Sequence, residues 1–107
     1  MRILLDECVP GPLRRELPGH DVRTVPEMGW PGKRNSELLQ LVVAANFEVF
    51  LTVDQNLQYQ QNLKAAGVAV MVLVAPSNRL ADLVPLMPKV QATLATIQPG
   101  DFIEVSA

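Results

Sequence analysis

Three segments of this 107-residue chain are as long as β-strands and consist mainly of apolar residues. They span residues 1–5, 48–53 and 68–74, and the last is also rich in β-branched side chains. A strand with one face in water alternates apolar and polar residues, whereas a strand covered on both faces does not. The three segments therefore predict a parallel sheet with helices packed on both sides.

Helical patterns and two weaker strands complete the chain. The predicted helices span residues 13–17, 35–45, 55–66 and 79–97, and the weaker strands span residues 21–25 and 102–105. Pro85 divides the last helical segment into two helices, because proline lacks an amide donor. In the third helix, which Gly67 ends, we expect residues 58–62 on the exposed side.

The resulting order of elements is β-α-β-α-β-α-β-α-α-β. Such alternation is typical of α/β proteins and implies right-handed crossovers between parallel strands. We therefore expect a single domain over residues 1–107. Its fold should be a three-layer α/β/α sandwich around a mostly parallel sheet of about five strands.

Charge and cysteine content limit the cellular compartments and the binding partners that suit this chain. The net charge is −2, so no general basic field attracts nucleic acid, and any such contact must come from local cations. Cys8 is the only cysteine, which excludes an internal disulfide and suits a reducing compartment. No apolar run is long enough for a signal peptide or a membrane span, so we expect a cytoplasmic protein without membrane contact.

Two of the apolar strands end in carboxylates. Asp6 and Glu7 follow the first strand, and Asp54 follows the strand over residues 48–53. Because ligands of parallel sheets bind beyond the carboxyl ends of the strands, we expect these acids to converge. Glu37 lies in the first turn of the helix that leads into the second of these strands. Each acid alone also has an ordinary interpretation, as a helix cap, a helix-dipole partner or a solvated strand end.

Clustered carboxylates repel one another and need a cation. Mg²⁺ or Mn²⁺ is the natural choice, because both are hard ions that bind oxygen and retain water. We predict Asp6, Glu7 and Asp54 as metal ligands, and Asp6, Glu37 and Asp54 as catalytic residues. Such a site can bind a phosphate oxygen and activate water for metal-assisted phosphodiester hydrolysis.

Four short motifs resemble one family when they are taken in order. They are Leu4-Leu5-Asp6-Glu7 followed by Pro10, Gly19-His20-Asp21-Val22, Asn35-Ser36-Glu37-Leu38-Leu39 and Leu51-Thr52-Val53-Asp54. Together they cover about the first two-thirds of the chain. In these motifs the chain resembles the small bacterial PIN-like proteins of the DUF5615 group, within the PIN-domain nuclease superfamily.

The resemblance implies a PIN-like fold and a Mg²⁺-dependent ribonuclease, similar to the toxin of a toxin–antitoxin pair. RNA would then be the substrate, and a cognate antitoxin protein would be a partner. Asp6 and Asp54 would bind the metal, with Glu37 and Glu7 completing the acidic pocket.

The chain departs from the family pattern at two positions. Asn35 stands where relatives usually have Asp, and Asn56 stands where they often have a second acid. Asparagine keeps an oxygen ligand but loses the charge, so metal affinity should weaken. We predict that both asparagines contact the substrate, together with the local cations Arg14, Arg15, Lys33 and Arg34.

Two other functions fit the same pattern. A binding or regulatory module that kept the fold and lost catalysis is consistent with the two asparagines. A receiver-type phosphoacceptor domain also has an acidic pair after its first strand and an aspartate after its third, but no Lys-Pro pair precedes the last helical region here. An exposed edge strand and the apolar last helices also make a homodimer a possible assembly. Arg79, which follows the strand over residues 68–74, is a helix-start residue that could reach the same edge.

Overall fold

The computed structural model describes residues 1–33, 35–55 and 57–107, and it excludes the side chains of residues 35 and 57–59. The strands are β1 (Arg2–Leu5), β2 (Asp21–Thr24), β3 (Val49–Thr52), β4 (Ala69–Val74) and β5 (Phe102–Ser106). The helices are η1 (Gly11–Glu16), α1 (Asn35–Ala44), α2 (Leu57–Ala65), α3 (Leu80–Leu83), η2 (Val84–Leu86) and α4 (Met87–Leu94).

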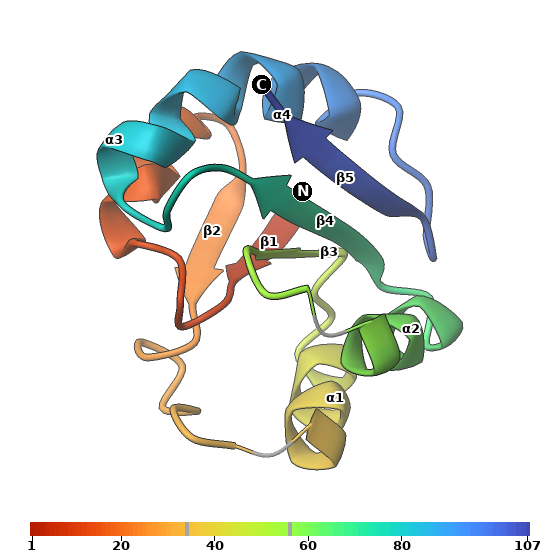
Figure 1. The fold of residues 1–107 in the computed structure, drawn as a ribbon. Helices are drawn as coiled ribbons and strands as arrows, with labels where there is room; N and C mark the ends of the chain where they lie inside the picture. The colour runs from red at the N-terminus through yellow and green to blue at the C-terminus, as the bar shows by residue number, and fades with distance from the viewer. Residues whose placement is uncertain (34, 56) are drawn as a thin grey trace.

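All five strands are parallel and form one sheet in the order β2-β1-β3-β4-β5 (Figure 1). Leu5, the last residue of β1, is in register with Thr24 on one side and Leu51 on the other. The carboxyl ends of β1, β2 and β3 therefore lie at the same edge. The order of the strands along the chain reverses between β1 and β3, which makes this pair the switch point of the sheet.

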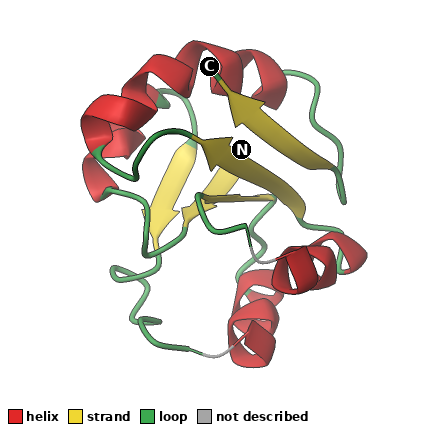
Figure 2. Cartoon of the chain, viewed as in Figure 1, coloured by secondary structure: helices red, strands yellow, loops and turns green. Residues whose placement is uncertain are grey.

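Helices cover both faces of the sheet, as Figure 2 shows, so the expected three-layer α/β/α arrangement is confirmed. On one face the alternate residues Leu4, Phe50 and Val70 pack with α1 and α2. On the other face Ile3 and Met71 pack with η1, α3 and α4. Burial of both residue sets explains why these strands are apolar at consecutive positions.

The helices differ from the expectation mainly in their type and length. The first is a 3₁₀ helix rather than an α-helix. The predicted break near Pro85 is confirmed, since η2 separates α3 from α4 there. Gly67, with φ of 84°, follows α2 in the left-handed conformation that suits glycine after a helix. Among the described residues, no helix is both long and apolar enough to cross a bilayer.

The expectation that every crossover is right-handed is wrong. The steps from β3 to β4 and from β4 to β5 move in the same direction across the sheet. The first passes over the face that α2 covers and the second over the face that α3 and α4 cover, so the two have opposite hands (Figure 1). A physical reason lies in the shortness of η1, because a six-residue 3₁₀ helix leaves room for a second connection on the same face of the sheet. Leu83, Leu86 and Val90 pack on that face together with Leu13 of η1.

Candidate functional site

The predicted acidic edge lies where β1 and β3 end side by side. The amide of Asp6 donates to the carbonyl oxygen of Leu51 at 2.9 Å, so Asp6 leaves the sheet directly beside β3. Asp54 follows β3 after one intervening residue and is exposed. The two aspartates thus flank the switch point, as the sequence predicts.

A buried hydroxyl connects the two aspartates. Thr52, the last residue of β3, is 1% exposed. Its Oγ1 donates to Asp6 Oδ2 at 2.7 Å and accepts the amide N–H of Asp54 at 3.0 Å. Thr52 therefore holds the Asp6 side chain and the Asp54 backbone in one arrangement. Its place in the Thr-x-Asp motif was visible in the sequence, but this bridging role was not.

Asp6 has further hydrogen bonds on both oxygens. Oδ1 accepts the amide N–H of Glu7 at 2.8 Å, and the Cys8 thiol lies 3.5 Å from Oδ2. Burial raises the pKa of Asp6 above its ordinary value and is the largest cause of the shift. The bonds from Thr52, Glu7 and Cys8 oppose this rise, and the negative charge of Asp54 adds to it. The site is therefore one in which a nearby cation would favour the charged form of Asp6.

The other two predicted acids point to different partners. Glu7 Oε1 accepts the amide N–H of Gly32 at 3.4 Å. Glu37 Oε2 lies 3.7 Å from Lys33 Nζ, and the Glu37 side chain is 56% exposed. Residues 1–33, 35–55 and 57–107 contain no group of three or more His, Cys, Asp or Glu side chains placed to hold a metal ion.

The donor set nevertheless fits one kind of cation. Mg²⁺ is commonly held by one or two carboxylates, with water in the remaining positions. Asp6 and Asp54 supply two carboxylates on segments that Thr52 connects. The described acids thus suit a hydrated Mg²⁺ or Mn²⁺ better than an ion enclosed by three or four side chains.

The predicted substrate-binding residues differ in their surroundings. Arg14 is paired with Glu27, at 3.0 Å, and Lys33 with Glu37. Arg15 is exposed, and no ion pair to it is found among the described residues. Arg34 and Asn56 lie outside the described residues, as does the side chain of Asn35.

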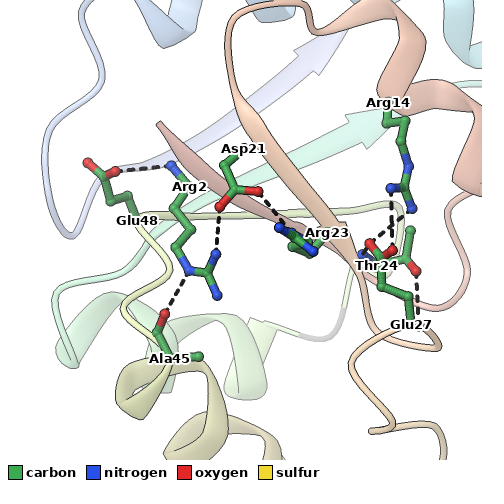
Figure 3. A network of polar contacts seen from close by, with 8 residues as sticks. All are labelled: Arg2, Arg14, Asp21, Arg23, Thr24, Glu27, Ala45 and Glu48. Atoms are coloured by element: carbon green, nitrogen blue, oxygen red, sulfur yellow. Dashed lines mark hydrogen bonds and ion pairs between the residues drawn. The ribbon is translucent and has the colours of Figure 1, made fainter.

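Figure 3 shows why several arginines are engaged elsewhere. Asp21, at the start of β2, binds Arg2 at 2.6 Å and Arg23 at 2.9 Å. The hydrogen bond from Arg23 is the largest cause that lowers the pKa of Asp21. Near the end of β2, Glu27 accepts the amide of Thr24 and also binds Arg14. These contacts fix the edge strand β2 and the turn after it, and among the predicted substrate-binding residues they engage Arg14.

Gln60, which contacts the backbone of Asp54, contradicts the predicted exposed side of α2. Residues 58–62 were expected on the exposed side of α2, but Gln60 is 1% exposed. Its Nε2 donates to the carbonyl oxygen of Asp54, and its Oε1 has no hydrogen-bond partner among the described residues. The sequence signal was weak, because a single glutamine among polar neighbours does not reveal which face of the helix is buried.

A cavity of about 290 Å³ lies at the opposite, amino edge of the sheet, lined in part by Met1, Val43 and Val68. It contains none of the predicted site residues. Comparison of the chain with protein-family models, with curated proteins and with solved structures finds no match. The resemblance to PIN-like proteins therefore stays a prediction from the sequence motifs.

Proposed function

We propose that this protein is a Mg²⁺- or Mn²⁺-dependent ribonuclease of the PIN-like type, acting at the edge between β1 and β3. The bridge from Asp6 through Thr52 to Asp54 is the observation that supports this most. It holds two acidic residues at the switch point of a parallel sheet, where α/β proteins bind their ligands.

Asp6 and Asp54 would hold the cation. When bound, it would polarise the phosphate and lower the pKa of water, which is the chemistry that phosphodiester hydrolysis needs. Thr52 orients Asp6 through Oδ2, and Glu7 orients it through Oδ1. Gln60 donates a hydrogen bond to the carbonyl oxygen of Asp54 and so fixes the backbone there. Glu37 stays a proposed member of the acidic rim, although Lys33 neutralises part of its charge.

The test is cleavage of a mixed RNA pool with Mn²⁺, compared with the same reaction in EDTA. We expect the wild type to cleave only with Mn²⁺, and Asp6→Asn and Asp54→Asn to fall to background. Glu104→Gln is the matched control, because Glu104 is an exposed acid on β5. Cleavage that survives in either aspartate variant would overturn the assignment. Failure of the wild type both to cleave and to bind Mn²⁺ would favour the non-catalytic module.

A receiver-type phosphoacceptor is the second candidate, because receivers share the strand order 2-1-3-4-5. Receivers use a hydroxyl at the end of the fourth strand, but β4 is followed here by Ala75 and Pro76. The next hydroxyl, on Ser77, donates to Asp82. Acetyl phosphate should label Asp54 if the receiver assignment is right, and should leave the protein unlabelled if it is a nuclease.

The biological setting we propose is that of a cytoplasmic toxin neutralised by an antitoxin protein. Its expression should then arrest growth, and Asp6→Asn should abolish the arrest. A homodimer would double the apparent mass in size-exclusion chromatography with light scattering.

A further inference from the structure

The turn after β4 is attached to the segment that contains Asp6. Asn78 Nδ2 donates to the carbonyl oxygen of Cys8 at 3.1 Å. The thiol of Cys8 in turn lies 3.5 Å from Asp6 Oδ2. Two contacts thus join the turn after β4 to Asp6 at the end of β1. Asn78 and Cys8 are 70 residues apart in the chain.

The same turn holds the backbone of Arg79 in place. Ser77 Oγ accepts the amide N–H of Arg79 at 3.0 Å and donates to Asp82. These bonds use the Arg79 backbone and leave the guanidinium uninvolved. Arg79 is exposed, and the described residues include no ion-pair partner for it. It differs in this from Arg14 and Lys33, whose charges are paired with glutamates.

We propose that Arg79 binds a phosphate group of the RNA beside the Asp6–Asp54 pair. The inference rests on the proposed function, because two carboxylates alone repel a polyanion and need a cation on the rim. A guanidinium suits this role, since its planar fork donates two parallel hydrogen bonds to a phosphate. The turn supplies the position, and the unpaired charge supplies the affinity.

The first test is the binding of a fluorescent single-stranded RNA in EDTA, where no metal-dependent cleavage occurs. We expect Arg79→Gln to weaken binding by about tenfold. The slope of the logarithm of the binding constant against the logarithm of the salt concentration should fall in magnitude by about one, which corresponds to one lost phosphate contact. Arg79→Lys should recover part of the loss, because the charge stays while the fork is lost. Lys64→Gln is the control, since it removes one exposed cation from the end of α2. It should change binding less than twofold.

The second test separates this inference from the proposed function. In Mn²⁺, Arg79→Gln should raise KM with a smaller change in kcat, because the contact precedes the reaction. If the protein binds RNA through Arg79 but cleaves nothing, the nuclease proposal fails and the phosphate contact stands. If the wild type cleaves RNA and Arg79→Gln behaves like Lys64→Gln, the inference is overturned. Thermal melting of each variant establishes that it folds.

Discussion

At the scale of single residues, the site depends on one hydroxyl. Thr52 is buried, yet both its donor and its acceptor are satisfied, by Asp6 and by the Asp54 amide. Buried polar groups stabilise a fold only when they are paired in this way. The threonine is therefore a structural partner of two aspartates that the sequence predicts as metal ligands because of their charge.

Thr52→Val should destabilise the protein, because valine has nearly the same shape but leaves Asp6 Oδ2 and the Asp54 amide without this partner. We expect a loss of about 1–3 kcal/mol in the free energy of unfolding. Urea denaturation measures it, and Thr52→Ser, which keeps the hydroxyl, is the control. Equal stability of the valine and serine variants would show that the bridge is unimportant.

Asp6→Asn should gain stability relative to the wild type as pH rises from acidic to neutral values. Burial raises the pKa of Asp6, so the folded protein binds this proton more tightly than the unfolded chain. The contribution of Asp6 to stability is then highest below the ordinary pKa of 3.8 and falls as pH rises through the raised value. The free energy of unfolding of the wild type, relative to that of Asp6→Asn, should therefore be highest at acidic pH. Urea denaturation of both proteins across this range is the measurement, and a stability of Asp6→Asn that grows relative to the wild type toward low pH would contradict the argument.

At the scale of elements, the sequence was most reliable for the strands. All five strands were predicted to within one residue of their observed bounds. For β1, β3 and β4 the reason is that burial on both faces demands consecutive apolar residues. The type of the first helix was missed, since proline-rich starts suit 3₁₀ and α-helices alike. The placement of the β4–β5 connection on the same face as η1 was also missed, because local patterns do not say which side of a sheet a helix covers.

Substitutions in the inner strands should be costly on both faces. Leu4 and Met71 belong to opposite core clusters, and both are 0% exposed. We expect Leu4→Ala and Met71→Ala each to cost about 2–5 kcal/mol, because truncation loses buried area and leaves a cavity. Glu104→Ala, at an exposed position of the edge strand β5, should stay within about 0.5 kcal/mol. Guanidinium denaturation tests all three, and a small effect at either core position would refute the two-sided core.

At the scale of the whole molecule, the protein is mildly acidic, and the proposed site adds to that charge locally. The proposed RNA binding would then rely on a cation at the site and on arginines without an ion-pair partner among the described residues, rather than on a general basic surface. The cations paired with Asp21, Glu27 and Glu37 contribute to structure more than to attraction.

Mn²⁺ should raise the melting temperature of the wild type, because a ligand that binds only the folded state stabilises it. The gain is about 1.4 kcal/mol when the free Mn²⁺ concentration is ten times Kd. Asp6→Asn and Asp54→Asn should lose the shift, and Glu104→Gln should keep it. Differential scanning calorimetry measures the shift. Equal shifts in all four proteins would indicate non-specific binding to surface acids.

Local sequence patterns predict the strands, their alternation with helices and the edge at which Asp6 and Asp54 emerge, because these features follow from local burial and chain direction. Which side chains come into contact depends on how the elements pack in three dimensions. Thr52 reaches Asp6 across 46 residues, and Asn78 reaches Cys8 across 70. Such contacts depend on strand order and on the face each connection crosses, and neither is encoded in the periodicity of any one segment.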